Sequence, residues 1–423
     1  MKHHIVVARL VGVLLVAMHA VPGRAVNLPM AYTEEELNAV RAWEQVWVGK
    51  KIDKNSIDNV AAFLPSSYVD LYKHPDLWGA PPEGLYFSIV PYQEIHETQG
   101  FLRATEQYAP RCKLDDRGSL VNIIGVAGRP FPMPATGLEV AWNYEMNTKG
   151  DGLQYRKFAP NINPRNRTER YADQEVWELY YINRTDRDPR PAFPHEMNPK
   201  AVRKAMFVHM YKPPEFLNTR MFNLRFIDQA KDDDAYLWYN QFRRIRRMST
   251  AQRTDSIDGT DLIYDDDNMW DGQLLRNTYT LKGKRDMLTC RHQNMRATTR
   301  VPGQGIVNGI TLERCNLYIL EVINKDQNYL YSKRLWYLDP ETYYIMWQEI
   351  YDRQGRFWKC FMNQIAPLPT ATGETRAFIV GTQYHDFQRL HCGESDHQAY
   401  YDPKLGIEVL PEMFTVGYLQ KTY

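Results

Sequence analysis

The stretch from residue 311 to residue 361 constrains the fold most, because apolar runs alternate there with turn sequences. The runs are rich in Tyr, Trp, Ile and Val, residue types that suit the pleated, half-buried surface of a strand. Two turn sequences separate them: Asp339 precedes Pro340 in DPET, and Gly355 supplies a positive φ in DRQGR. The pattern predicts an antiparallel meander whose apolar strands must be covered by helices or by a ligand.

Similar alternation continues through most of the chain after residue 170. Turns rich in Asp, Asn, Gly and Pro connect the runs, as they do between successive antiparallel strands. The predicted strands are 174–183, 203–211, 219–228, 235–240, 243–248, 274–282, 312–324, 332–338, 343–351, 356–361 and 377–386. Residues 149–170 and 184–200 are polar and are expected to form loops. Before them, Thr33 and Glu36 make a capping box that predicts a helix over residues 33–48.

This order of elements predicts an α+β protein built on one large antiparallel sheet. A sheet of about ten strands must curl, close or split. We therefore expect a strongly curved, incomplete β-barrel with N-terminal helices over its concave face. Residues 26–130 would form the helical part and residues 131–423 the half-barrel with its C-terminal tail, together making one continuous domain.

Residues 1–25 have the pattern of a secretory signal peptide. Basic residues precede the apolar run LVGVLLVAM, which is too short to span a bilayer, and the end of the segment fits a cleavage site. The pattern predicts export to the periplasm, free or associated with the outer membrane. Because that compartment is oxidising, one or two disulfides are expected among Cys112, Cys290, Cys315, Cys360 and Cys392, with Cys315 and Cys360 as candidates for proximity.

Charge and motifs argue against several classes of function. The chain has 52 Lys and Arg against 51 Asp and Glu, so it lacks the basic excess of a nucleic-acid-binding domain. It contains no nucleophile–base motif, P-loop or zinc-protease motif, so we expect neither an enzyme nor a cofactor. Residues 385–397 hold His and Cys without zinc spacing, and the acidic stretch 259–272 fails the EF-hand pattern, so no metal is expected.

Aromatic residues make up 13% of the chain and supply the candidate ligand contacts. The proline-rich segment 128–143 is either a rigid connector or the rim of a pocket. Tryptophans on the predicted strands would face the same cavity. The predicted contacts with a hydrophobic ligand are Phe131, Met133, Trp142, Trp238, Trp336 and Trp347.

Four arginines follow a predicted turn near residues 240–241, namely Arg243, Arg244, Arg246 and Arg247. Arg244 and Arg246 share one face of the strand and could contact an anionic headgroup. Alternatively, the arginines pair with the acidic run 265–267 and are structural. We expect this pairing.

Four strings in a fixed order carry a family resemblance, and they are GRPFPMPATGLEVAWN, YLWYNQFRRIRRMS, DGTDLIYDDDNMWDGQ and SKRLWYLDPETYYIMWQEIYDRQGRFWK. Over roughly residues 30–420 the chain resembles an uncharacterised bacterial envelope family labelled outer-membrane-lipoprotein-sorting-protein-like. Its members look like enlarged relatives of the lipoprotein carriers LolA and LolB. The resemblance implies an incomplete β-barrel with an apolar cavity for acyl chains and no catalytic residue. It also implies association with an inner-membrane transporter of the resistance-nodulation-division kind and with an outer-membrane partner.

The leading hypothesis is a monomeric periplasmic carrier or chaperone that binds a lipid or another hydrophobic molecule within the half-barrel. The alternative is a non-enzymatic structural or adaptor subunit of an envelope transport complex without a bound ligand. An aromatic-lined sheet can bury most of an apolar ligand, and each buried methylene contributes about 0.8 kcal/mol.

Overall fold

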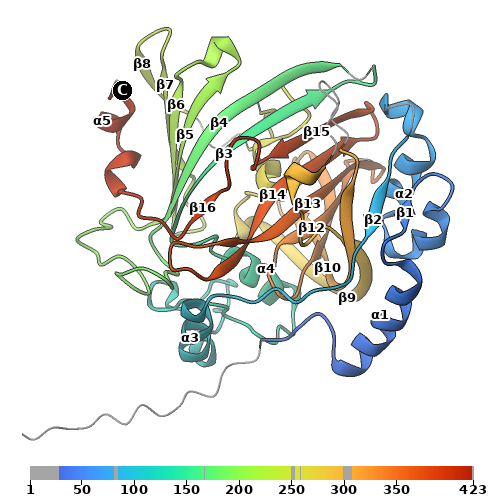
Figure 1. The fold of residues 1–423 in the computed structure, drawn as a ribbon. Helices are drawn as coiled ribbons and strands as arrows, with labels where there is room; N and C mark the ends of the chain where they lie inside the picture. Colours follow the sequence, from blue (N-terminus) through green and yellow to red (C-terminus); the bar gives the residue numbers. More distant parts are fainter. Residues whose placement is uncertain are drawn as a thin grey trace, which may run out of the picture.

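The computed structural model describes residues 28–80, 84–165, 167–248, 253–257, 259–298 and 307–421 (Figure 1). The signal peptide expected over residues 1–25 lies outside these residues. Among the described helices, none combines the length and apolar composition needed to cross a membrane.

Strands account for most of the described chain. They are β1 (Lys51–Ile52), β2 (Phe87–Ile89), β3 (Gly152–Ile162), β4 (Thr168–Tyr180), β5 (Val202–Lys212), β6 (Arg220–Phe226), β7 (Asp234–Tyr239), β8 (Arg244–Met248), β9 (Asn277–Thr289), β10 (Ile310–Asn324), β11 (Tyr331–Leu338), β12 (Ile345–Asp352), β13 (Phe357–Pro369), β14 (Thr375–Asp386), β15 (His391–Asp396) and β16 (Lys404–Leu405).

Helices are fewer and short. The α-helices are α1 (Glu34–Trp47), α2 (Ser66–Lys73), α3 (Gln99–Tyr108), α4 (Gly137–Glu145) and α5 (Val416–Leu419). The 3-10 helices are η1 (Ile57–Phe63), η2 (Pro75–Trp78), η3 (Ala109–Arg111), η4 (Ile123–Gly125), η5 (Pro214–Phe216), η6 (Tyr264–Met269), η7 (Leu274–Arg276), η8 (Met295–Ala297) and η9 (Pro411–Phe414).

All sixteen strands belong to one open sheet. Its order is β1-β2-β10-β11-β12-β13-β14-β15-β3-β4-β5-β6-β7-β8, with β9 paired to β10 and β16 paired to β3. The pairings are antiparallel apart from β2 with β10, which is parallel. Within the described residues the end strands β1 and β8 are not paired with each other, so the sheet curves into an arch without closing (Figure 1).

The meander predicted over residues 311–361 is present as β10 to the start of β13. The DPET turn closes with the amide of Tyr343 donating to the carbonyl oxygen of Asp339 at 2.8 Å, and Gly355 has a φ of 77°. The predicted capping box is also present, because Thr33 and Glu36 cap the first turn of α1 reciprocally. These turns and the helix start were predicted correctly because each depends only on residues close together in sequence.

Two of the strands longer than three residues occupy places where the sequence did not predict them. β3 runs through the expected loop 149–170, and β15 was not predicted at all. β3 contains Pro160 and the inward-facing Lys157, which interrupt the alternation of apolar and polar residues that identifies a strand. Pairing with β4 along its length overrides this weak local pattern.

The two faces of the sheet carry separate cores. On one face α1, η1, α2 and η2 pack against β10–β14, where the rings of Tyr68 and Trp347 lie 4.7 Å apart. On the other face α4 and η6 cover Trp336, whose ring lies 5.0 Å from Trp270. Phe361 belongs to this second core and also borders the cavity described below, so this face is the concave one.

An α+β fold with a large, open and mostly antiparallel sheet is therefore confirmed, with one difference in detail. The helices α1 and α2 cover the opposite, convex face, and α4 with η6 covers part of the concave face. The C-terminal segment packs against the face of β5–β7 that points away from the concave side, and there the ring of Tyr418 lies 5.5 Å from that of Phe207.

The cysteines form no disulfide. Cys112, Cys290, Cys315, Cys360 and Cys392 are all free thiols. Cys315 and Cys360 share one core cluster, but they lie on β10 and β13, with β11 and β12 between them in the sheet. The expectation of disulfides is wrong, because membership of one meander does not bring two strands into adjacent positions.

Candidate functional site

A cavity of about 900 Å³ lies on the concave face of the sheet. Strands β3–β8 line it together with parts of β13–β15 of the same sheet, and the described residues of the segment 253–271 form the facing wall. This volume falls within the range of small-molecule sites, which measure roughly 300–1,000 Å³. Among the described residues it is the obvious candidate for a binding site.

Strand alternation makes the sheet wall apolar. On β5, Met206, Val208 and Met210 face the cavity, whereas the intervening Phe207 packs against the C-terminal segment on the other side. Cross-strand partners lie on the same face of a sheet. Val208 pairs with Val176 on β4 and with Met221 on β6, so the apolar surface continues across the strands.

Methionines are unusually concentrated on this wall. The four that border the cavity, all half-buried, are Met206, Met210, Met221 and Met248. Methionine is flexible and polarizable, so such a surface can adapt its shape to different apolar ligands. The sequence analysis missed this wall, although alternate positions in KAMFVHMYK carry two of these methionines.

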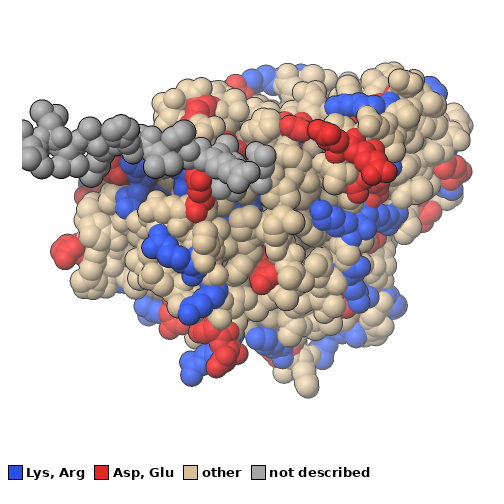
Figure 2. All heavy atoms as spheres, turned by 90° about the horizontal axis from the view of Figure 1, so that it is seen from below, with Lys and Arg blue, Asp and Glu red and all other residues tan. Residues whose placement is uncertain are grey.

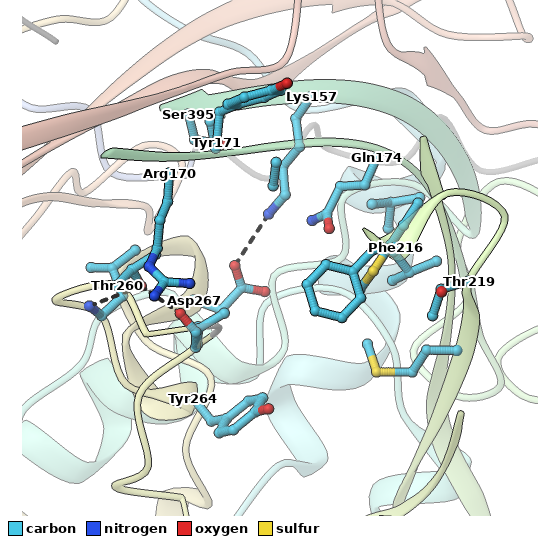
Figure 3. A pocket seen from close by; sticks show the side chains of 18 of the residues that line it. Lys157, Arg170, Tyr171, Gln174, Phe216, Thr219, Thr260, Tyr264, Asp267 and Ser395 are labelled. Carbon is cyan, nitrogen blue, oxygen red and sulfur yellow. Dashed lines mark hydrogen bonds and ion pairs between the residues drawn. The ribbon is translucent and has the colours of Figure 1, made fainter. Parts of the chain in front are cut away.

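The cavity also has a polar side (Figure 3). Lys157 points inward from β3, and its Nζ lies 3.4 Å from Oδ1 of Asp267 on the facing segment. Gln174 of β4 and Tyr264 of η6 add hydrogen-bonding groups. Lys157 is 8% exposed, so a polar group of a ligand that reaches it would meet a largely dehydrated charge.

A buried ionic network holds the facing segment in place. Arg225 of β6 contacts Asp233 at 2.8 Å and Asp271 at 2.7 Å. Arg253 lies 3.3 Å from Asp233, and Lys204 lies 2.8 Å from Asp271. Burial alone would raise the pKa of Asp233 and Asp271, but Arg225 and the neighbouring Arg253, helped at Asp271 by Lys204, hold both pKa values below their ordinary range.

The acidic run 265–267 is paired, although its partners are not the predicted ones. Asp265 contacts Arg253, and Oδ1 of Asp266 lies 2.8 Å from Arg334. Asp267 faces Lys157. The expected pairing with the arginines after residue 242 is therefore wrong, because tertiary packing brings cations from β3 and β11 to this run first.

Arg244 and Arg246, the predicted headgroup contacts, are exposed on the edge strand β8. Their register partners Tyr239 and Leu237 border the cavity, so both arginines lie on the cavity side of the sheet without lining the cavity itself. The guanidinium of Arg246 lies 6.0 Å from the ring centroid of Tyr239.

Three predicted contacts belong to the core beneath α4. Trp142 and Trp336 are 1% and 0% exposed, and their Nε1 atoms donate to the carbonyl oxygen of Gly118 and to Oε1 of Gln348, both at 2.8 Å. Phe131 packs beside them, half-buried. These side chains are on the concave side of the sheet but do not border the cavity.

The other three lie elsewhere. Trp347 is buried on the convex face, where its Nε1 donates to the carbonyl oxygen of Leu288 at 2.9 Å. Trp238 faces the C-terminal segment, and Met133 is 80% exposed. None of the six predicted contacts borders the cavity of the described residues, so the structure does not bring them together there.

Histidines and acids form no metal site in the described residues, where no group of three or more candidate ligands is placed around one point. His385 is buried against Trp78, with ring centroids 5.2 Å apart, and burial lowers its pKa to about 3. His391 lies 2.7 Å from Asp261 through Nδ1. On the surface, basic and acidic side chains are interspersed over the face seen in Figure 2.

Comparisons with known proteins identify relatives without an assigned role. The family described as protein of unknown function DUF1329 matches residues 51–420. The uncharacterized protein PA3922 of Pseudomonas aeruginosa is 21% identical over 322 residues, which are 73% of this chain and 67% of that protein.

Solved structures that are similar to this chain include two with informative names. One, from Vibrio parahaemolyticus, is provisionally named an outer membrane lipoprotein-sorting protein domain; it is 15% identical and covers 67% of this chain and 98% of its own, with a TM-score of 0.47. The LolA superfamily protein NE2245 of Nitrosomonas europaea is 14% identical and covers 67% of this chain and 100% of its own, with a TM-score of 0.41.

The family match confirms the family resemblance drawn from the sequence. Since the match spans most of the chain, this protein belongs to the DUF1329 family of proteins of unknown function.

Proposed function

We propose that this protein is a non-enzymatic carrier that takes a lipid or another hydrophobic molecule into the cavity between β3–β8 and the segment 253–271. The observation that carries the proposal is the methionine-rich wall of a cavity of about 900 Å³. An apolar wall that its own side chains leave uncovered in an aqueous medium is costly, and an apolar ligand would remove that cost.

The proposed ligand is an amphiphile with one extended apolar part. Burying each methylene against the methionines would contribute about 0.8 kcal/mol, so eight methylenes would give about 6 kcal/mol before ordering costs. Lys157 and Asp267 would contact its polar group, because they form the charged pair on the wall of the cavity.

We further propose that the carrier works in the periplasm as a monomer within an envelope transport system. The name of the similar solved structure from Vibrio parahaemolyticus refers to outer membrane lipoprotein sorting and favours this setting. Its partners would be an inner-membrane transporter of the resistance-nodulation-division kind and an outer-membrane protein.

A fluorescence titration tests the proposal. A fatty acid with a dansyl group at its end would be added to the purified protein, and we expect saturable binding at micromolar concentration. Met221→Glu places a carboxylate on the apolar wall and should weaken binding at least tenfold, because a charge opposes an apolar ligand. Met197→Glu is the matched control, since Met197 is 49% exposed and lies outside the cavity.

Absence of saturable binding by the folded wild-type protein would refute the carrier function and favour the adaptor alternative. Equal binding by the wild-type protein and Met221→Glu would show that the probe occupies another site.

A further inference from the structure

Three hairpin turns lie at the same end of the sheet, the end at which the cavity opens. They are the β3–β4 turn (described at 163–165 and 167), the β5–β6 loop (213–219) and the β7–β8 turn (240–243), which the antiparallel pairings place at one end. Figure 1 shows these tips at the top of the view. Lys212 and Glu215 border the cavity and are exposed, so the cavity opens beside the β5–β6 loop.

An apolar track leads from the cavity to the outermost tip. Phe216 and Tyr239 line the cavity, and their ring centroids lie 6.5 Å apart. The ring of Phe242 follows 6.0 Å beyond Tyr239. Phe242 is 63% exposed and Leu217 is 47% exposed, so large apolar side chains project into solvent from two neighbouring tips.

Four arginines follow Phe242 in the turn and along β8. Arg243, Arg244, Arg246 and Arg247 are exposed, and Arg247 pairs with Asp234 at 2.8 Å. Among the described residues no carboxylate forms an ion pair with the other three arginines. Charges on an edge strand commonly prevent sheet-to-sheet aggregation, which would explain the arginines. That explanation leaves the exposed Phe242 without a role.

We propose that this tip surface, formed by Leu217, Phe242 and the arginines of 243–247, docks on an anionic lipid bilayer. Aromatic side chains suit the boundary between headgroups and acyl chains, and arginines near an anionic surface are attracted to its phosphates. Docking in this orientation brings the cavity mouth to the bilayer, so an amphiphile can pass along Phe242, Tyr239 and Phe216. The inference rests on the proposed carrier function and adds the surface through which the ligand enters or leaves.

Vesicle flotation tests the proposal with the full mature chain. Two vesicle compositions would be used, pure phosphatidylcholine and phosphatidylcholine with 30% phosphatidylglycerol. We expect the wild-type protein to float with the anionic vesicles and to be released by 0.5 M salt. Arg244→Gln/Arg246→Gln should reduce the partition coefficient about 30-fold, because each basic residue near the surface contributes roughly 1 kcal/mol. Phe242→Ser should reduce it at least fivefold.

Matched controls carry equivalent changes away from the tips. Arg103→Gln/Arg117→Gln removes two exposed arginines, and Met133→Ser removes a side chain that is 80% exposed. Both controls should float as the wild-type protein does. Each variant would also be titrated with the dansyl fatty acid in solution, where the tip variants should bind it normally.

The outcomes separate this inference from the carrier function. Normal probe binding with no flotation of the wild-type protein would overturn the docking surface and leave the carrier function standing. Unchanged flotation of both tip variants, or equal flotation with neutral and anionic vesicles, would also overturn it. Loss of probe binding by the wild-type protein would instead refute the carrier function.

Discussion

Arg225→Met should destabilise the protein strongly, because Arg225 neutralises the buried Asp233 and the half-buried Asp271. The guanidinium, 2% exposed, contacts Asp233 at 2.8 Å and Asp271 at 2.7 Å. Removing one partner of a buried ion pair costs about 3–5 kcal/mol. We expect a loss of about 3 kcal/mol in the free energy of unfolding, at the lower end, because Arg253 and Lys204 still neutralise part of the charge.

Urea and thermal unfolding at pH 7 measure this loss. An unfolding entropy of about 2.1 cal/mol/K per residue over roughly 400 residues gives about 0.8 kcal/mol/K, so Tm should fall by about 4 °C. Arg276→Met is the matched control, because Arg276 pairs with Asp232 at the surface, where the side chains are 39% and 47% exposed. Its cost should stay below about 1 kcal/mol.

The same substitution has a predicted pH dependence. The pKa values of Asp233 and Asp271 are lowered in the folded protein, where Arg225 and the neighbouring cations together outweigh the opposing effect of burial. Their contribution is therefore complete above the unfolded pKa of about 3.9 and is lost as the pH falls below it. In the variant both carboxylates can relieve their burial by protonation, so the difference from wild type should shrink between pH 7 and pH 4.

A loss below about 1 kcal/mol at pH 7, or an equally large loss at pH 4, would refute the assignment of this network as a buried, charge-dependent anchor. The anchor also bears on the cavity, because Asp271 and Arg253 belong to the facing wall. The variant should accordingly bind the dansyl fatty acid more weakly than Arg276→Met does.

Three further predictions concern residues outside the cavity. Trp347→Phe should cost about 1–3 kcal/mol in unfolding free energy, through the lost bond to Leu288, yet leave the probe affinity unchanged because Trp347 lies on the convex face; a large loss of affinity would contradict this placement. Burial lowers the pKa of His385 to about 3, so below pH 6.5 the unfolded chain takes up a proton that the folded protein does not, and the free energy of unfolding should fall by about 1.4 kcal/mol per pH unit. His385→Leu should remove this contribution from the pH dependence measured by urea unfolding. An unchanged pH dependence in the variant would contradict the burial of His385. Burial raises the pKa of the Cys112 thiol to about 11, which slows its reaction, but the other four cysteines are fully buried and Cys112 is only half-buried. A thiol reagent at pH 8 should therefore modify Cys112 first and react with all five thiols only after unfolding. Rapid reaction of several thiols in the native protein would contradict the burial of these four cysteines.

Local sequence signals predicted much of the fold. The capping residues Thr33 and Glu36 and the turn at Gly355 act over a few positions, so their structures follow from neighbouring residues alone. The run of turn-separated strands also predicted the open antiparallel sheet. β3 was not predicted because its strand conformation depends on pairing with β4, and the local sequence of β3 gives no sign of that pairing.

The candidate site was harder to predict because it depends on which face each strand presents. Trp336 and Trp347 lie on adjacent strands of one meander, yet they belong to cores on opposite faces of the sheet. A shift of one residue in register moves a side chain to the other face, and the aromatic content of a strand does not indicate its register. Met206 and Met221 are brought together by the pairing of β5 and β6, and methionine is not a typical strand residue.

The predicted ion pairs between the acidic run 265–267 and the arginines were wrong for a related reason. Asp267 is close in sequence to the arginines of β8, but it meets Lys157, which is distant in sequence. Closeness in sequence does not predict which charged side chains meet when a long segment crosses the concave face of a sheet. The sequence therefore predicted the open antiparallel sheet, whereas the six side chains that it predicted as ligand contacts do not border the cavity.

The most direct test of the carrier function is crystallography of the protein with 12-bromododecanoic acid. Anomalous scattering locates the bromine without assumptions about the rest of the ligand. A bromine peak between the methionine wall at Met206 and Met221 and the facing segment at Leu262 is the predicted result. An ordered complex with bromine only on the outer surface, or a cavity that its own side chains fill in the crystal, would contradict the carrier function.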